Sequence, residues 1–305
     1  MLEIFKLIVP IFLLIGVGSV LKIMKIADDT WVEVLNRYGL YIGFPSLIFL
    51  NLISLVPEDL AAKAEVFIVN GLLLVLVMLA ALGISILLKL PPERANAIML
   101  AAIFGNIAYL GYPLIGRVYP GRGPETTIII SIYVLILFSL GILLLEVRRH
   151  QREPLLQIAY GILRNPFIVA IVLGVLVFGL GWKIPPAVHT ALEMLSQSAS
   201  PVVLVSLGVF LARKIPLHSI WKPALAVTAM RLFLVPALFY VVAWRMNSIE
   251  LYQVTVLEAA MPLAVTPFAL SSMYPLDRSL TVTVIFISSI ASLLTLPLWV
   301  MWMAG

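Results

Sequence analysis

Ten apolar segments, each roughly 20 residues long, constrain the fold of this chain more than any other feature of its sequence. A helix of that length crosses the hydrocarbon layer of a bilayer. A backbone in lipid must satisfy its own hydrogen bonds, and the apolar residues do not alternate with polar ones as barrel strands require. The sequence therefore predicts an all-α integral membrane protein with ten transmembrane helices. These spans, one to ten in chain order, lie near residues 4–24, 31–55, 66–88, 95–118, 124–145, 165–182, 187–211, 219–244, 250–274 and 279–303.

The composition agrees with this prediction and excludes several classes of protein. Hydrophobic residues make up 62% of the 305 residues, charged residues make up 11%, and the mean hydropathy is +1.12. Soluble domains carry about 25% charged residues, so a soluble enzyme, a nucleic-acid-binding protein and a disordered chain are all excluded. The chain has no cysteine, which excludes disulfides, thiolate metal sites and a cysteine nucleophile.

The basic residues predict the orientation of the chain in the membrane. Of the 20 Lys and Arg residues, twelve fall in loops or span ends on one side and six on the other, while Arg37 and Arg231 lie inside spans. Cytoplasmic loops carry an excess of Lys and Arg. The longest loop, 146–164, is therefore predicted to be cytoplasmic, and both termini are predicted to lie outside. The net charge of +5 reflects this orientation rather than a nucleic-acid partner.

The two halves of the chain repeat their turn-forming residues at an offset of 155–156 positions. The matched positions are Pro10 and Pro166, Gly18 and Gly174, Pro45 and Pro201, and Tyr119-Pro120 and Tyr274-Pro275. Residues 1–150 and 151–305 are therefore predicted to form two five-helix repeats. Because five is odd, the repeats must enter the membrane from opposite faces, and inverted repeats are a common design of secondary transporters.

Spans four and nine are the two spans most interrupted by helix-breaking residues. Proline removes a backbone donor and clashes with the preceding turn, and non-helical backbone at membrane depth persists only when it lines a polar cavity or is buried in protein. We therefore predict that both helices are broken and that a ligand binds where they cross. The alternative is that these residues only kink the helices. The predicted breakers are Gly105, Gly111, Pro113, Pro262 and Pro267.

Two charged residues fall deep inside spans, Glu258 in span nine and Arg231 in span eight. Intramembrane charges are costly and indicate a functional site by default. Glu258 is predicted to couple transport to an ion, as a ligand of Na⁺ or as a carrier of H⁺; a structural ion pair and direct contact with substrate are the alternatives. Arg231 can bind a substrate carboxylate through two parallel hydrogen bonds, or it can form a fixed salt bridge with Glu258 or Glu193.

Two amide side chains add to these polar groups. Asn106 stands beside the predicted break of span four, where it can hold substrate or ion, or can cap the broken helix end. Gln197 precedes Pro201 in span seven, where it can line the cavity or join neighbouring helices through hydrogen bonds.

Several stretches of the sequence carry a family resemblance. They are Leu35-Asn36-Arg37, Phe44-Pro45-Ser46-Leu47-Ile48-Phe49, Gly105-Asn106, Leu110-Gly111-Tyr112-Pro113-Leu114, Arg164-Asn165-Pro166, Ser200-Pro201, Ser206-Leu207-Gly208, Glu258-Ala259-Ala260-Met261-Pro262 and Pro267-Phe268. They resemble the auxin efflux carrier family, and the similarity covers nearly the whole chain. Where plant members have proline and glutamine, this chain has Gly105 and Glu258.

The resemblance to auxin efflux carriers implies an architecture and a mechanism. Spans one, two, six and seven would form a scaffold, and spans three to five and eight to ten would form a moving transport domain. Spans four and nine would cross beside the substrate, which an elevator-like movement would carry across the membrane.

The segment 258–261 also looks like part of the bile acid:sodium symporters, which have a related fold. In those proteins a Glu-x-x-Met segment and an asparagine on the partner helix help to bind sodium. The resemblance implies that Asn106 and Glu258 are sodium ligands here, assisted by hydroxyl groups of span five. The implied ion-coupling residues are Asn106, Glu258, Met261, Thr127 and Ser131.

Together these observations predict a secondary active transporter of a small organic anion in the cytoplasmic membrane of a prokaryote. No G-x-x-x-x-G-K-[ST] motif is present, so ATP is not expected to drive transport, and no cofactor is expected beyond a coupling Na⁺ or H⁺. The substrate carboxylate is expected to face the half-helix amides at the crossing. The predicted substrate-binding residues are Asn106, Ile107, Tyr109, Pro262, Leu263, Thr266, Arg231 and Gln197.

Alternatives of other kinds stay open. A proton-coupled or uncoupled anion exporter of the auxin-carrier type differs in its coupling ion, and a channel or membrane sensor differs in class. An intramembrane enzyme has no support, because the spans contain no G-x-S-x-G elbow, no paired aspartates and no histidine cluster. The expected partners are the substrate and the lipid bilayer, without nucleic acid, and homodimer formation is left open.

Overall fold

The computed structural model describes residues 2–55, 57–148, 154–213, 217–271 and 273–304, and these form helices and no strand. Each of the ten predicted spans contains helix. Among the described residues, five helical stretches are long and apolar enough to cross a membrane: Ala64–Leu87, Gly123–Val147, Pro186–Leu211, Ile220–Arg245 and Arg278–Met303. The shorter stretches Val9–Ile23 and Pro166–Gly179 are also apolar. The all-helical class is confirmed, and the number of crossings stays a prediction.

The helices follow the order of the predicted spans. In the first half they are α1 (Leu2–Ile23), α2 (Asp29–Tyr38), α3 (Phe44–Ile53), α4 (Pro57–Leu87), α5 (Pro92–Ile103), α6 (Tyr112–Val118), α7 (Gly123–Ile136) and α8 (Ile142–Val147). In the second half they are α9 (Leu155–Leu163), α10 (Pro166–Gly179), α11 (Pro186–Leu211), α12 (Leu217–Ala229), α13 (Val235–Arg245), α14 (Ile249–Ala259), α15 (Thr266–Leu270) and α16 (Arg278–Ala304).

Four wide π-helical turns connect some of these helices without breaking them. They are η1 (Gly39–Gly43), η2 (Ile107–Gly111), η3 (Leu137–Gly141) and η4 (Met230–Leu234). Three of them end two residues before a proline, at Pro45, Pro113 and Pro236. Proline cannot donate a backbone hydrogen bond and its ring clashes with the carbonyl four residues earlier. A widened turn accommodates both effects, so the chain stays helical through these prolines.

Large apolar side chains cover the outer surface of the molecule. Leu13 on α1 is 63% exposed, Leu72 on α4 is 66% exposed and Leu294 on α16 is 64% exposed. A soluble monomer does not expose apolar patches on this scale, whereas lipid tails solvate them without cost. The exposed residues therefore agree with a multi-pass membrane protein.

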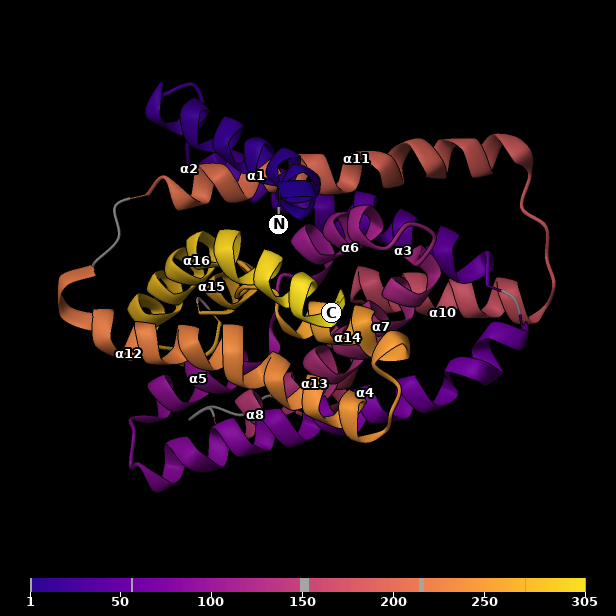
Figure 1. Ribbon diagram of the computed structural model, residues 1–305. Helices are drawn as coiled ribbons and strands as arrows, with labels where there is room; N and C mark the ends of the chain where they lie inside the picture. Colours follow the sequence, from indigo (N-terminus) through magenta and orange to yellow (C-terminus); the bar gives the residue numbers. More distant parts are fainter. Residues whose placement is uncertain (1, 56, 149–153, 214–216, 272, 305) are drawn as a thin grey trace.

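Two pairs of helices pack at unusually short distances. A β-carbon at Gly18 of α1 would lie 2.0 Å from the backbone oxygen of Val205 on α11, and one at Gly174 of α10 would lie 2.9 Å from Cβ of Leu52 on α3. Small residues allow such close approach between membrane helices. Figure 1 shows α1, α2 and α11 together along one side, whereas α4, α5, α12 and α13 lie on the other.

Candidate functional site

The helices of spans four and nine are both interrupted, and their non-helical segments pair with each other. Residues 104–106 separate α5 from η2, and residues 260–265 separate α14 from α15. An antiparallel β-bridge joins Gly105 to Leu263. The predicted interruptions at Gly105 and Pro262 are therefore present. Gly111 and Pro113, also predicted as breakers, lie instead in the continuous helix formed by η2 and α6.

The pairing satisfies backbone groups that the interruptions leave without helical partners. The amide of Asn106 donates to the carbonyl of Pro262 at 2.7 Å, and the amide of Ala264 donates to the carbonyl of Phe104 at 2.9 Å. The amide of Leu263 donates to Oγ of Ser288 on α16 at 3.1 Å. An unsatisfied backbone group costs several kcal/mol in lipid, so these bonds stabilise the crossing as a fixed structure.

A cavity of about 580 Å³ opens beside the crossing, a size typical of small-molecule sites. Its inner part is lined by residues 104–109 of span four and 264–266 of span nine, and its mouth by charged residues of α2 and by Arg213, which follows α11. Of the predicted substrate-binding residues, Asn106, Ile107, Tyr109 and Thr266 line this cavity.

The other predicted substrate-binding residues lie elsewhere. The side chain of Leu263 is 1% exposed and packs behind the crossing, and Pro262 is also buried. Arg231 is fully buried and does not line the cavity. Gln197 is exposed on the surface of α11, away from the cavity, because the helix turns that position outward.

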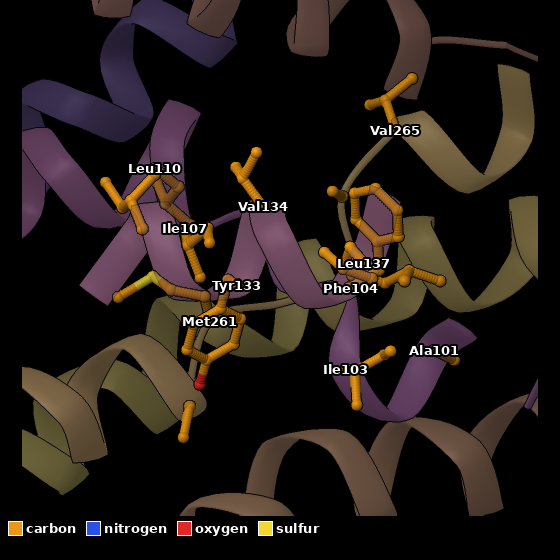
Figure 2. Close-up of a cluster of buried hydrophobic side chains, with 14 of the residues drawn as sticks. Ala101, Ile103, Phe104, Ile107, Leu110, Tyr133, Val134, Leu137, Met261 and Val265 are labelled. Atoms are coloured by element: carbon orange, nitrogen blue, oxygen red, sulfur yellow. The ribbon is translucent and has the colours of Figure 1, made fainter. Parts of the chain in front are cut away.

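Aromatic rings form much of the cavity wall. Phe44 stacks on Tyr109 with ring centroids 4.8 Å apart, and Phe104 meets Phe138 edge to face at 6.1 Å. Figure 2 shows the adjoining buried cluster, in which Ile107, Tyr133 and Met261 come from three different segments and lie close together. A rigid apolar wall with few polar groups is typical of ligand sites, because the polar groups then fix the orientation of the ligand.

Glu258 is fully buried, and neither of its carboxylate oxygens has a hydrogen-bond partner. Nδ2 of Asn106 and the hydroxyl of Tyr133 are likewise buried without partners. Buried polar atoms of native proteins are almost always bonded, so each exception needs an explanation such as a ligand, an ion or water. The partnerless carboxylate belongs to a residue that the sequence predicts as an ion ligand, whereas the partnerless Nδ2 of Asn106 is a hydrogen-bond donor, which suits an anion or water and not a cation.

Space for the carboxylate of Glu258 comes from Gly111. A β-carbon at Gly111 would lie 2.5 Å from Oε2 of Glu258. The backbone of Gly111 is ordinary helix, with φ −63° and ψ −53°. Glycine is therefore needed at this position for the close approach of the carboxylate and not for an unusual backbone conformation.

The remaining predicted ion-coupling residues have part of their bonding capacity in use. The hydroxyl of Thr127 donates to the carbonyl of Gly123 at 3.1 Å, and the hydroxyl of Ser131 donates to the carbonyl of Thr127 at 2.8 Å. Each hydroxyl oxygen keeps lone pairs that can face a cation. The carbonyl of Met261 accepts a hydrogen bond from Arg231 at 2.8 Å.

Arg231 forms no ion pair with Glu258 or Glu193 within the part of the chain that the structure describes. Its guanidinium group donates instead to backbone carbonyls at the ends of α5 and α14. The salt bridge from Arg231 to Glu258 or Glu193, which the sequence left open, is therefore absent between these described residues. The guanidinium instead uses its donors for backbone carbonyls at the C-terminal ends of helices.

Charged residues cluster at the mouth of the cavity. Asp29 accepts from Nζ of Lys22 at 2.8 Å and pairs with Arg213 at 3.0 Å. The hydrogen bond from Lys22 and that from Arg213 hold the pKa of Asp29 below its usual value. Arg37 pairs with Glu33 at 3.2 Å. The mouth therefore presents cations that are partly neutralised by carboxylates.

Sequence reasoning missed two residues that support the site, Ser288 and Tyr133. Ser288 holds the amide of Leu263, and Tyr133 lies within electrostatic range of Arg231 and Glu258. Ser288 stands next to Ser289 in a span that carries several other hydroxyl residues, and Tyr133 lies among apolar residues of span five. Such residues are a weak signal, because hydroxyl groups often bond within their own helix. Among the described residues there is no group of three His, Cys, Asp or Glu side chains that could hold a metal ion.

Comparison with known proteins identifies the family of this chain. A family model described as membrane transport protein matches residues 3–300. An uncharacterized transporter of Methanothermobacter thermautotrophicus is 29% identical over 301 residues, which cover 96% of each chain. A candidate malonate transporter of Rhizobium meliloti is 25% identical over 305 residues, covering 97% of this chain and 94% of the relative. An auxin efflux carrier component of Arabidopsis thaliana is 28% identical over 131 residues, 42% of this chain and 35% of the carrier.

The match across almost the whole chain confirms the family resemblance drawn from the motifs. This protein therefore belongs to the membrane transport protein family that includes the auxin efflux carriers, and it is a membrane transporter.

Proposed function

We propose that this protein is a secondary active transporter of a small organic carboxylate, which binds in the cavity beside the crossing. The observation that carries the proposal is the uncapped helix start at Ile107. Asn106 precedes this helix without capping it through its side chain, and both residues line the cavity. A helix N-terminus presents free amides and partial positive charge, which attract a carboxylate. Nδ2 of Asn106, buried without a partner, adds a side-chain donor.

A small dicarboxylate is the substrate that we favour. Thr266 lines the same cavity from span nine, so its hydroxyl is available as a donor to a second carboxylate. The relative from Rhizobium meliloti, named for malonate, supports this choice. The aromatic walls contributed by Tyr109 and Phe138 would exclude larger polar solutes.

The architecture of the proposal has ten membrane-spanning helices in two inverted five-helix repeats, with an elevator-like movement of the transport domain. Its support is a pair of contacts related by the repeat. Gly208 packs against α1 beside Gly18, and Gly174 packs against Leu52. Adding 156 positions to Gly18 gives Gly174, and subtracting 156 from Gly208 gives Leu52. The same contact therefore occurs twice with the roles of the two halves exchanged, as a two-fold relation requires.

Coupling to Na⁺ through Glu258 and Asn106 is the second part of the proposal. Sodium prefers oxygen ligands, and the partnerless carboxylate supplies two of them at the crossing. The amide oxygen of Asn106 and the hydroxyls of Thr127 and Ser131 are neutral oxygens that can complete the shell. Proton carriage by Glu258 is the alternative, favoured by the absence of any bonded cationic side chain at its carboxylate within the described chain.

The proposed location is the cytoplasmic membrane of a prokaryote, with both termini outside and loop 146–164 in the cytoplasm. Asp29 and Arg213 lie at the mouth of the cavity. Both follow spans that end on the side of the membrane with the excess of basic residues, which is predicted to be cytoplasmic. With this orientation the cavity opens to the cytoplasm, which corresponds to an inward-facing conformation.

Substrate counterflow in proteoliposomes tests the binding site. We expect saturable exchange of labelled malonate. We expect Asn106→Ala to raise the half-saturating concentration about tenfold, because one charge-assisted hydrogen bond contributes roughly 1.5 kcal/mol. Asn247→Gly is the matched control, since Asn247 is an exposed loop residue with φ of 52°. Unchanged exchange by the Asn106 variant would contradict the site, and flux that does not saturate would indicate a channel.

Ion gradients test the coupling. We expect a Na⁺ gradient to drive malonate accumulation in the wild type and expect Glu258→Gln to abolish that dependence. If Glu258→Gln keeps a full Na⁺ response, the carboxylate is not the sodium ligand. A wild type that ignores Na⁺ and responds to a pH gradient, with that response lost in Glu258→Gln, establishes the proton alternative.

A further inference from the structure

Arg231 lies where the C-terminal ends of two broken helices meet. Its Nη1 donates to the carbonyl of Ala102 at 2.8 Å, its Nε to the carbonyl of Met261 at 2.8 Å, and its Nη2 to the carbonyl of Glu258 at 3.5 Å. Ala102 lies in the last turn of α5 and Glu258 in the last turn of α14, while Met261 lies in the non-helical segment just after α14. The side chain is fully buried.

Carbonyl groups at such a place attract a cation. The last four carbonyls of a helix have no partner in the helix, and the helix dipole gives them partial negative charge. In transporters with discontinuous helices, these half-helix ends and the unwound carbonyls coordinate the coupling cation. The carbonyls of Ala102, Met261 and Glu258 have this position, but an arginine of the protein already occupies them.

We propose that the guanidinium group of Arg231 is a tethered cation, which fills the carbonyl site at the crossing permanently so that no mobile cation binds there. It links the ends of α5 and α14 in every step of the transport cycle, including the steps in which no ion or substrate is bound. This role differs from substrate binding, for which Arg231 would need access to the cavity. It also holds whether or not Na⁺ couples transport, because it concerns different oxygen atoms from those of the Glu258 carboxylate.

Two local features hold the guanidinium in this site. A β-carbon at Gly105 would lie 1.9 Å from Nη2 of Arg231, so only glycine leaves room for the group against span four. Arg231 is also the second residue of the wide turn η4. Such turns leave backbone groups without their regular partners, and here Nε1 of Trp299 donates to the carbonyl of Leu232 at 2.9 Å.

Chemical rescue of Arg231→Ala in the full-length, detergent-purified protein tests the proposal. We expect the melting temperature to fall by roughly 5 °C or more, because buried carbonyls lose their cation. Millimolar methylguanidinium should restore most of this loss, whereas methylurea, a neutral molecule of nearly the same shape, should not. Arg245→Ala is the matched control: Arg245 ends the same span but is exposed, so neither loss nor rescue is expected there.

The result that overturns the proposal is equal rescue by methylurea, which would show that hydrogen bonding without charge suffices, or no rescue by either compound. If Arg231→Ala cannot be purified, Arg231→Lys and Arg231→Met provide the comparison. Lysine keeps the charge and methionine keeps only the length, so we expect Arg231→Lys to give the higher yield of monodisperse protein and the higher melting temperature. Equal behaviour of these two variants refutes a role for the charge.

Discussion

Replacing Gly111 with alanine separates the structural role of span four from its role in holding the Glu258 carboxylate. The added β-carbon would lie 2.5 Å from Oε2 and 3.1 Å from Cδ of Glu258, whereas ordinary contact begins at 3.4 Å. The carboxylate must therefore move by about 0.9 Å or the two helices must separate. The three atoms nearest to this β-carbon all belong to the Glu258 carboxylate, so the perturbation acts first on that group.

Two effects of opposite sign determine the stability of Gly111→Ala. The backbone is helical at this position, so alanine contributes about 0.5–1 kcal/mol of helix propensity. Overpacking of a filled site costs about 1–3 kcal/mol. We expect a net loss of about 1 kcal/mol in the free energy of unfolding. A shift of the carboxylate by most of an ångström should affect ion binding more than it affects stability. We expect the apparent Na⁺ affinity to fall about tenfold or more, and a tenfold fall corresponds to about 1.4 kcal/mol.

Thermal unfolding measured during titration with NaCl, with choline chloride to keep ionic strength constant, is the assay. Gly116→Ala is the matched control, because Gly116 lies in the same helix and an added β-carbon there meets nothing within 4 Å. It should gain the helix propensity and keep the full response to Na⁺. If Gly111→Ala unfolds and responds to Na⁺ as Gly116→Ala does, the carboxylate is not confined by Gly111 and the reasoning fails.

Three further predictions follow from contacts at the crossing, the helix pairs and the cavity mouth. Ser288→Ala leaves the amide of Leu263 without its acceptor and should cost about 1–3 kcal/mol of unfolding free energy; an unchanged denaturation midpoint refutes this. Gly18→Ala should prevent stable folding, since its β-carbon would overlap the α11 backbone, while Gly16→Ala, with nothing within 4 Å, should be tolerated in a detergent stability assay. Asp29→Asn should lower stability by less than about 1 kcal/mol, because the ion pair is exposed. Because the pKa of Asp29 is lowered, its contribution is fully present above the usual carboxyl value of 3.8 and is lost as the pH falls below that value. The melting curves of wild type and variant should therefore differ at pH 7, and the difference should shrink as the pH is lowered below 3.8.

Much of the fold was predictable because it depends on local properties of the chain. The length of the apolar segments predicts helices at the observed places, and glycine and proline mark where spans four and nine are interrupted. The prediction was less precise for individual breakers. Pro113 has the same chemistry as Pro262, yet the first follows a wide turn inside a helix and the second lies in a non-helical segment. The difference depends on whether another segment can pair with the freed backbone, which no local pattern contains.

The candidate site was predictable in its residue types and not in its contacts. Asn106 and Thr266 line the cavity as expected, because they adjoin the interruptions that form it. Gln197 does not, since the direction of a side chain on a long helix depends on how that helix is rotated against its neighbours. The depth of Arg231 predicted either contact with a substrate carboxylate or a fixed salt bridge, whereas its partners are carbonyl groups that a sequence does not mark as special.

The sequence by itself determined that this chain is a helical membrane protein of a transporter family, because hydropathy over a helix length and the motifs of spans four and nine are properties of neighbouring residues. Only the tertiary structure decided which polar atoms meet at the crossing. Arg231 and its acceptor Ala102 are separated by 129 positions, and Glu258 reaches Gly111 from the other half of the chain. Hydrogen bonds and close contacts act over a few ångströms, so such partners exist only after the two halves have packed together.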